Sequence, residues 1–181
     1  MFHANKARRL CKDSVALLQK QMQRIDNVMP MNPPKFIADC HLGRLAKYLR
    51  ILGYDTLYFP HIEDNDLINL ANKEGRIILT RDKALSKRKK ANAFYLLPTD
   101  IQEQLQALFT RFGLSKKAHT FPRCTICNTP LHIVEKEKVL HLLPEGVKKN
   151  FDYFEQCPAC RRIYWHGDHY RNMMSLLDEI Q

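Results

Sequence analysis

Between Lys35 and Phe112, short apolar runs alternate with amphipathic stretches, and this alternation constrains the fold more than any other feature. Four runs with the composition of strands occupy residues 35–39, 54–59, 76–80 and 93–97. Each is followed by apolar side chains at helical spacing, over residues 41–53, 63–75, 81–90 and 99–113. Strand–helix alternation repeated four times predicts an α/β fold with a doubly wound parallel sheet and right-handed crossovers.

The ends of these helices carry their usual residues. Gly53 and Gly75 follow the first and second helical stretches, where a residue without a Cβ favours termination. Thr99 or Asp100 is the expected cap of the fourth helix, because its side chain can accept a hydrogen bond from a free backbone amide.

The sequence changes character on both sides of the alternation. Residues 1–30 form a basic, moderately amphipathic stretch that predicts a helix, and the prolines of "MPMNPP" end it. Residues 114–122 have the composition of a linker, and the segment beyond them holds two C-x-x-C pairs, a helical stretch near residues 144–154 and a short amphipathic helix over 171–180. We therefore predict an N-terminal basic helix and linker (1–33), an α/β domain (34–115) and a cysteine-bearing domain with a C-terminal helix (116–181).

Composition narrows the class of protein. The 181 residues are 45% hydrophobic and 27% charged, as expected of a soluble globular chain. No apolar run approaches the roughly 18 residues that span a membrane, and the basic N-terminus lacks the apolar block of a signal peptide; a surface helix is favoured there over a transit peptide. The net charge of +10 favours an anionic partner, nucleic acid first, over a merely basic soluble protein.

Acidic residues stand where the predicted strands end. Asp39 ends the first strand, Asp82 directly follows the third, and Asp64 and Asp66 open the helix after the second. Ligands of parallel sheets bind outside the carboxyl ends of the strands, at the point where strand order reverses. Carboxylates converging there would repel one another without a cation, and their hard oxygens suit Mg²⁺ or Mn²⁺. Asp100 begins the helix after the fourth strand and is a further candidate ligand.

The competing interpretation of these acids is structural. Asp64, Asp66 and Asp100 are all suited to capping a helix N-terminus. Asp39 and Asp82 are harder to explain in this way, because each directly follows an apolar strand. We therefore predict a catalytic cluster of Asp39, Asp64, Asp66 and Asp82, with Asp39 and Asp82 as ligands of a Mg²⁺ or Mn²⁺ ion that activates water.

Positive charge adjoins the candidate metal ligands. One group lies opposite the apolar stripe of the first helix, and a second follows the third strand. An RNA backbone held at a metal needs positive charge beside the metal to bind its phosphates. The alternative is that these charges only form a solvated surface, which is the more common role of a run of charge. The predicted RNA contacts of the two groups are Arg44, Lys47, Arg50, Arg81, Lys87, Arg88, Lys89 and Lys90.

Two C-x-x-C pairs predict a structural zinc site. Four thiolates at Cys124, Cys127, Cys157 and Cys160 would fill a tetrahedral ion, which excludes catalysis at that metal. The alternative, a redox pair of the thioredoxin kind, requires a neighbouring βαβ start that is absent here. The paired cysteines are confined to the C-terminal third of the chain, whereas a disulfide framework would spread them through it. They therefore indicate metal binding in a reducing compartment, and a cytoplasmic location is expected.

The segment around the second pair interleaves cations with aromatic rings. Arg161, Arg162, Tyr164 and Trp165 give the mixture that stacks on unpaired bases, so single-stranded RNA is the expected partner. Packing of Tyr164 and Trp165 onto the main domain is an equally good explanation of the two rings. Arg161, Trp165 and His169 are the RNA contacts predicted in this segment.

At this level of detail the chain resembles the Mut-seven C-terminal RNase family, in which a PIN-like domain precedes a zinc ribbon. The resemblance rests on "DCHLGRLAKYLRILGYDT", "DNDLINLANKEGRIILTRD", "CTIC" and "CPACRRIYWHGDH", and runs from about Lys35 to Met174. It implies a PIN-like fold and metal-dependent RNA cleavage. Asp39 and Asp82 match the acids at the first and third strand ends, Asp64 matches the acid before the second helix with Asp66 beside it, and Asp100 matches by position alone.

These inferences lead to a Mg²⁺- or Mn²⁺-dependent ribonuclease, expected to be an endoribonuclease. The alternative is a non-catalytic RNA-binding adaptor, in which the acids are helix caps and the basic face and zinc ribbon bind RNA. A nucleotide-binding regulator on a flavodoxin-like sheet is less well supported, because "LGRLAKYLRILG" is no glycine-rich phosphate loop.

Overall fold

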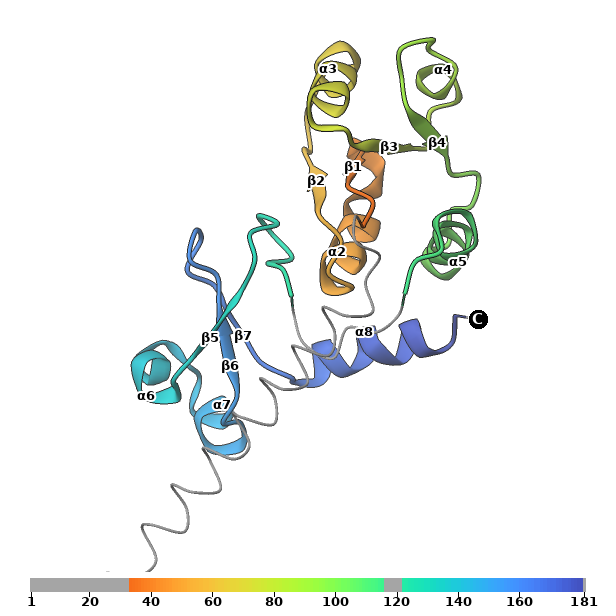
Figure 1. Cartoon of the computed structure of the whole chain (residues 1–181). Coiled ribbons are helices and arrows are strands. Elements are labelled where there is room, and N and C mark those ends of the chain that lie inside the picture. The colour runs from red at the N-terminus through yellow and green to blue at the C-terminus, as the bar shows by residue number, and fades with distance from the viewer. Residues whose placement is uncertain (1–32, 116–121, 181) are drawn as a thin grey trace, which may run out of the picture. The chain divides into compact units, whose positions relative to one another are not determined.

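Four short strands form a fully parallel sheet in the computed structural model, which describes residues 33–115 and 122–180 (Figure 1). These are β1 (Phe36–Ala38), β2 (Thr56–Tyr58), β3 (Ile77–Thr80) and β4 (Ala93–Tyr95). Their order in the sheet is β2-β1-β3-β4, with Ile37 paired to Leu57 on one side and Ile78 on the other. The predicted strands and their parallel arrangement are thus confirmed.

Helices cover both faces of this sheet (Figure 1). They are the short 3-10 turn η1 (Cys40–Leu42) and the helices α2 (Gly43–Ile51), α3 (Asp64–Glu74), α4 (Lys83–Ser86) and α5 (Ile101–Phe112). On one face, Leu67 of α3 and Leu85 of α4 are buried in one cluster with Ile37 and Ile78. On the other face, Phe112 of α5 packs edge-on against Phe36 of β1, with ring centroids 5.5 Å apart.

Several predicted helix ends are confirmed in atomic detail. Gly75 and Gly113 end α3 and α5 with φ angles of 64° and 62°, in the left-handed region that favours glycine. Asp100 caps α5, accepting hydrogen bonds from the backbone amides of Gln102 and Glu103. The sequence therefore predicted these helix ends well, because each end depends on the glycine or aspartate that stands there and not on distant contacts.

The helix predicted over residues 81–90 is much shorter in the structure. α4 ends at Ser86, and the basic segment beyond it follows a turn. Contacts with α3 hold that turn: Arg88 donates to Asn65 and Asp64, and Asn72 donates to the backbone carbonyl of Lys90. Four successive cations also repel one another on a helix, so tertiary contacts override the local helical preference.

The chain from 122 to 180, here named the cysteine region, contains an antiparallel three-stranded sheet of order β5-β6-β7. Its strands are β5 (His132–Val134), β6 (Phe154–Gln156) and β7 (Ile163–Tyr164). Between β5 and β6 lie α6 (Lys136–Val139), η2 (Leu140–Leu142) and α7 (Glu145–Asn150), and α8 (Asp168–Asp178) follows β7. The predicted helices near 144–154 and 171–180 are confirmed as α7 and α8, whereas the sequence did not predict α6.

Two findings complete the account of the fold. Residues from Pro34 onward form one compact unit, while the helix predicted within residues 1–33 lies outside the described residues. In the described part of the chain, no helix has both the length and the apolar character needed to cross a bilayer.

Candidate functional site

The switch point of the parallel sheet lies between β1 and β3, and two predicted metal ligands stand there. Strand order reverses at this point because β2 lies on the far side of β1 while β4 lies on the far side of β3. Asp39 directly follows β1, and Asp82 follows β3 after one intervening residue. The structure therefore places both carboxylates at the sheet edge where ligands of open parallel sheets bind.

The buried hydroxyl of Thr80 connects these two acids. Thr80 Oγ1 donates a hydrogen bond of 2.7 Å to Asp39 Oδ2 and accepts one of 2.9 Å from the Asp82 backbone amide. The Cys40 amide also donates to Asp39, at Oδ1, so both oxygens of that carboxylate are oriented by the protein. A carboxylate has about four lone-pair sites, so an Asp39 held in this way can still bind a cation.

Asp82 has a structural role as well. Its Oδ1 accepts hydrogen bonds of 2.6 Å from the Ala84 amide and 3.2 Å from the Leu85 amide, which caps α4. Both bonds reach the same oxygen, so capping occupies only one side of the carboxylate. The capping alternative therefore describes Asp82 correctly without excluding a metal at its second oxygen.

The remaining predicted acids lie differently. Asp64 Oδ2 forms an ion pair of 2.8 Å with Arg88 Nη2, and each side chain is 43% exposed. Asp66 lies exposed in the first turn of α3, and Asp100 caps α5. Asp64 begins α3 without capping it, because the N-cap position is occupied by Glu63. An arginine, rather than a shared cation, thus compensates the charge of Asp64 in this structure.

The grouping of possible metal ligands supports this separation. Among the described residues, two sets of three or more His, Cys, Asp or Glu side chains have their ligand atoms within 4.8 Å of one another. One set is Asp39 with its neighbours Cys40 and His41, and the other is the four predicted zinc ligands. Neither set includes Asp64, Asp66 or Asp82, so the convergence of four carboxylates is not seen.

The donors beside Asp39 are unusual for a site of hard oxygens. Cys40 Sγ lies 3.0 Å from His41 Nδ1, and both side chains are exposed. Slight desolvation and the neighbouring Asp39 carboxylate raise the pKa of the Cys40 thiol above its usual value, which disfavours the thiolate. Tyr58 secures this turn: its hydroxyl donates to the Cys40 carbonyl, and its ring leaves no room for a Cβ at Gly43.

The predicted RNA contacts on α2 divide into exposed and buried residues. Arg44 and Lys47 are exposed, and the Arg44 guanidinium lies 5.9 Å from the centre of the Tyr48 ring. Arg50, by contrast, is only 3% exposed and donates to the backbone carbonyls of Thr56, Thr125 and Ile126. The prediction that Arg50 binds RNA is therefore wrong, because its guanidinium is consumed inside the protein.

The basic segment after α4 is largely available to a ligand. Lys87, Arg88, Lys89 and Lys90 are all exposed, and so is Arg81, which precedes α4. Arg88 differs from the others because it is already paired with Asp64 and hydrogen-bonded to Asn65. We infer that Arg88 positions this segment, which leaves Lys87, Lys89 and Lys90 to face solvent.

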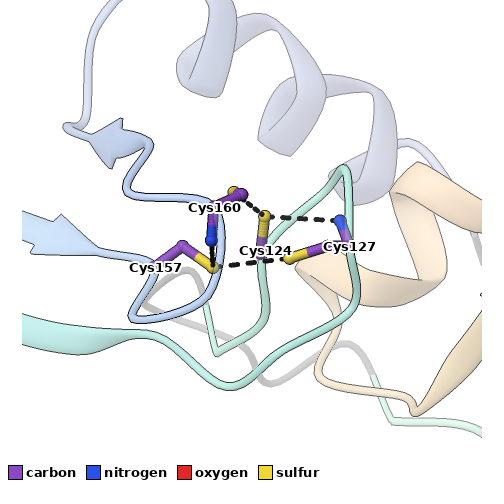
Figure 2. Close-up of side chains that lie close together, drawn as sticks. All are labelled: Cys124, Cys127, Cys157 and Cys160. Carbon is purple, nitrogen blue, oxygen red and sulfur yellow. Dashed lines mark hydrogen bonds between the residues drawn. The ribbon is translucent and has the colours of Figure 1, made fainter.

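The four predicted zinc ligands converge in the cysteine region (Figure 2). Cys124 Sγ lies 3.5 Å from Cys160 Sγ, and Cys127 Sγ lies 3.4 Å from Cys157 Sγ. Zn–S bonds of about 2.3 Å place the sulfurs of a tetrahedral site about 3.8 Å apart. Four thiols at nearly this spacing fit a structural zinc ion that needs no other ligand.

The two C-x-x-C turns share one backbone design. The second cysteine of each donates its amide to the sulfur of the first, Cys127 to Cys124 and Cys160 to Cys157. The residue after each second cysteine has a positive φ, 68° at Asn128 and 63° at Arg161. An amide directed at a sulfur stabilises its thiolate, so each turn favours the thiolate of its first cysteine as a metal ligand.

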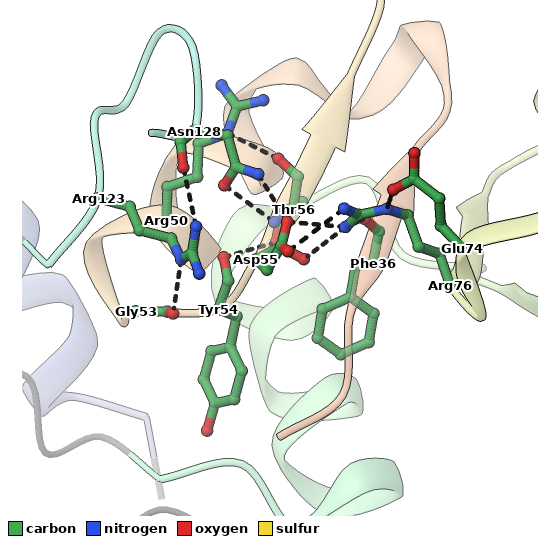
Figure 3. Close-up of polar contacts among 10 residues, drawn as sticks. All are labelled: Phe36, Arg50, Gly53, Tyr54, Asp55, Thr56, Glu74, Arg76, Arg123 and Asn128. Atoms are coloured by element: carbon green, nitrogen blue, oxygen red, sulfur yellow. Dashed lines mark hydrogen bonds and ion pairs between the residues drawn. The ribbon is translucent and has the colours of Figure 1, made fainter. Parts of the chain in front are cut away.

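Polar contacts fasten the first C-x-x-C turn to the parallel sheet (Figure 3). Asn128 Nδ2 donates to Asp55 Oδ1 at 2.7 Å, and its Oδ1 accepts from the Thr56 amide at 3.1 Å. Arg123 donates to the carbonyls of Gly53 and Asn128. With Arg50, these bonds fix the cysteine cluster against the α2–β2 corner.

The same network continues into the sheet. Arg76 donates to Asp55 Oδ1 at 2.7 Å and to Glu74 Oε2 at 2.6 Å. Burial alone would raise the pKa of the Asp55 carboxyl, but hydrogen bonds from Arg76 and Asn128 outweigh it and hold that pKa below its usual value. Asp55 is therefore a structural anion at the base of the sheet, opposite the edge that carries Asp39.

The predicted RNA contacts of the cysteine region are only partly free. Arg161 and His169 are exposed, as a nucleic-acid contact requires. Trp165 is half-buried and packs against the cluster of Val139, Leu143 and Phe154. This packing lies within the cysteine region and not on the main domain, and Trp165 also lines a cavity.

Several residues of the site escaped sequence reasoning. Thr80, Asp55 and Asn128 each hold a functional group through a side-chain hydrogen bond from a distant part of the chain. The sequence did hold one indication for Thr80, because a hydroxyl at the end of a buried strand needs a hydrogen-bond partner. Asn128 had another, because asparagine tolerates the left-handed conformation that follows a C-x-x-C turn.

Comparison with known proteins agrees with the resemblance in sequence. The Mut7-C RNAse domain matches this chain over residues 34–177, which includes both the parallel sheet and the cysteine cluster. No curated protein and no solved structure matched the chain. An RNase domain indicates a ribonuclease-type function with RNA as the substrate, and the chain belongs to the Mut7-C RNAse domain family.

Proposed function

We propose that this protein is a Mg²⁺- or Mn²⁺-dependent ribonuclease that cuts RNA at the carboxyl edge of its parallel sheet. The observation that carries the proposal is the placement of Asp39 and Asp82 on either side of the Thr80 hydroxyl at the switch point. A divalent ion held by these carboxylates would activate a water molecule and neutralise charge on the phosphate. Asp64 and Asp66 join the centre in this proposal if RNA or the ion displaces Arg88.

The protein's own residues supply the rest of the proposed mechanism. Thr80 orients the Asp39 carboxylate, and the α4 amides hold Asp82 in one rotamer, so neither acid must be ordered when RNA arrives. Arg44, Lys47 and the segment around Lys87 flank the edge with positive charge for the phosphate backbone. Arg161 extends that charge into the cysteine region, where the exposed His169 offers a further polar contact.

The finer parts of the proposal concern architecture and location. We take residues 34–115 as a PIN-like nuclease domain and residues 116–181 as a zinc ribbon with a C-terminal helix. The matched C-x-x-C turns support the ribbon, and the 2-1-3-4 strand order supports the PIN-like sheet. A cluster of reduced thiols fits the cytoplasm, where disulfides are rare.

One specific observation favours the non-catalytic alternative, an RNA-binding adaptor. Asp82 and Asp100 both cap helices, and Asp64 is neutralised by Arg88, so three of the predicted acids have structural partners. An adaptor and a nuclease would bind RNA alike through the basic surface. They differ in whether a divalent ion brings about cutting.

A circular single-stranded RNA separates these functions and tests the proposed endonucleolytic mode. A ring without ends can be opened only by internal cleavage, so a linear product that requires Mn²⁺ supports an endoribonuclease. The metal-free control should omit divalent ions rather than add chelator, because a chelator would also attack the cysteine cluster. Binding of the ring without any cleavage at saturating Mn²⁺ would favour the adaptor.

A further inference from the structure

A cavity of about 530 Å³ lies where three parts of the compact unit meet. Lys47 of α2 forms one wall, and Ile126 of the first C-x-x-C turn forms another. The remaining walls come from Arg162 and Trp165 around β7 and from His169 of α8. This volume is within the range of about 300–1,000 Å³ that is usual for small-molecule and cofactor sites.

Basic side chains are among the residues that line this cavity. Lys47, Arg162 and His169 are all exposed, and they come from three separate segments of the chain. The one acid in the lining, Asp168, is already paired with Arg171 through a hydrogen bond to the guanidinium. Lys47 and Arg162 therefore give the cavity an excess of positive charge, which suits an anionic ligand.

The interior of the cavity is aromatic and firmly held. The Trp165 ring packs so closely on Gly167 that a Cβ there would lie 2.7 Å from Trp165 Nε1. Tyr164 is anchored by its hydroxyl, which lies 3.1 Å from Cys124 Sγ and accepts from the Thr125 amide at 3.2 Å. Rigid rings bind a flat ligand without the loss of side-chain freedom that a mobile surface would incur.

The first C-x-x-C turn, which also lines the cavity, is fixed as well. Arg50 Nη1 donates to the carbonyls of Thr125 and Ile126 at 2.8 and 3.0 Å, so the turn that carries Ile126 cannot move independently of α2. The backbone of Ile126 is thus held in place, but its large apolar side chain is 47% exposed. Together with Trp165, it gives the cavity lining both an apolar and an aromatic side chain that can contact a planar group.

We propose that this cavity binds one unpaired nucleotide of the RNA, with the base between Ile126 and Trp165 and the phosphate at Lys47 and Arg162. The combination of cations with aromatic and apolar walls is the chemistry by which proteins hold single strands. A paired base cannot enter, because its faces are covered by its neighbours in the duplex. The inference rests on the proposed ribonuclease function and adds a requirement for an unpaired nucleotide near the cut.

The position of α2 relates the cavity to the catalytic edge. α2 begins at Gly43, just after the turn that carries Asp39, and Lys47 follows about 6 Å further along the axis at 1.5 Å per residue. Arg44 lies one turn before Lys47 and is exposed, so it can contact the phosphate backbone between the two places. The nucleotide in the cavity is thus expected to lie within a few nucleotides of the scissile bond.

Fluorescence of Trp165 tests this inference directly, because it is the only tryptophan in the chain. The full-length Asp82→Asn protein is titrated with a short single-stranded oligouridylate, and binding is followed in parallel by anisotropy of a labelled copy. We expect a saturable change of Trp165 emission whose midpoint matches the anisotropy. A blunt RNA duplex should bind with little change in emission.

Variants locate the site of the signal. The double variant Lys47→Ala/Arg162→Ala should weaken oligouridylate binding about tenfold. The matched control, Lys73→Ala/Lys149→Ala, removes the same charge from exposed positions outside the cavity and should bind as before. Gly167→Ala should displace the Trp165 ring and reduce the change in emission while the phosphate contacts remain.

The outcomes separate this inference from the proposed function. Unchanged Trp165 emission at saturating RNA would overturn the nucleotide site, whether or not the wild-type protein cleaves RNA. An equal response to polyglutamate would also overturn it, because the cavity would then be a general anion site. A saturable response that the double variant weakens, in a protein that never cleaves, would uphold the site and overturn the ribonuclease.

Discussion

The hydroxyl of Thr80 donates a hydrogen bond of 2.7 Å to a carboxylate oxygen of Asp39, across two neighbouring strands of the parallel sheet. Thr80 is fully buried, so the bond is shielded from water and holds the carboxylate in one orientation. Asp39 is consequently prepared for a ligand before any ligand arrives. In the proposed enzyme, Thr80 is a positioning residue that acts through Asp39 and through the amide of Asp82.

Replacing Thr80 by valine should show how far cleavage depends on the orientation of the Asp39 carboxylate, because the charge of that carboxylate is unchanged. Valine keeps the shape but removes the hydroxyl, which leaves the Asp82 amide without its acceptor and Asp39 without its donor. Loss of a partner behind a metal ligand typically lowers activity about 10- to 100-fold. We expect that loss in Mn²⁺-dependent cleavage, with a higher Mn²⁺ requirement, and Thr80→Ser should restore both. Equal activity of the serine and valine variants would contradict the role of the hydroxyl.

The basic segment after α4 should contribute to RNA affinity without sequence preference. Changing Lys87, Lys89 and Lys90 to alanine should weaken binding of all single strands alike. The slope of log K against log salt should fall by up to about 2, at about 0.7 for each lost phosphate contact. The comparison protein carries alanine at Lys138, Lys148 and Lys149, an equal change of charge in the cysteine region. If both triple variants lose the same slope, the segment is only a solvated basic surface.

The cysteine cluster should hold one zinc ion per chain. Cys157→Ser removes one of four ligands and should release the metal and unfold the cysteine region, since a structural zinc ion supplies much of the folding free energy of a small module. Cys40→Ser is the matched control because Cys40 lies outside the cluster. Metal content and far-UV circular dichroism measure both effects. Wild-type protein that purifies without zinc would refute the assignment.

The Asp55 carboxylate should make stability depend on acid pH. Its pKa in the folded protein lies below the unfolded value, so its contribution is present above about pH 4 and is lost as pH falls through the folded pKa. The difference in melting temperature between wild type and Asp55→Asn should therefore be largest near neutrality and shrink below about pH 4. A difference that stays constant from pH 7 to pH 3 would show that Asp55 acts by shape alone.

The sequence was sufficient for features that depend on local chemistry. Alternating composition located all four parallel strands, and Gly75, Gly113 and Asp100 mark helix ends that glycine and aspartate favour anywhere. Cysteine spacing likewise located the cysteine cluster, because two C-x-x-C pairs at this spacing are typical of one shared site. These features need no knowledge of distant contacts.

The errors all involve residues whose role depends on a distant partner. Arg50 follows the helical charge pattern of Arg44 and Lys47, and only the folded chain shows carbonyls of the first C-x-x-C turn around it. The ion pair of Asp64 with Arg88, 24 residues away, was likewise not predicted, and the catalytic role of Asp64 stays a proposal. The short α4 has the same origin, since contacts with α3 end it. The periodicity and the motifs of a sequence do not show which distant residues contact one another.

The most direct test of the central claim uses Asp82→Asn, which has nearly the same shape as the wild-type side chain. Asparagine keeps an oxygen that can accept from the Ala84 amide, so the α4 cap should survive and the melting temperature should change little. It cannot supply the charge that a divalent ion requires. Cleavage of labelled single-stranded RNA in Mn²⁺, RNA affinity and melting temperature are measured on the same preparation, beside wild type. We predict that cleavage is abolished while affinity and stability are retained. Full cleavage by the variant, with stability lowered by about 1 kcal/mol as for a lost cap, would contradict the proposed metal centre.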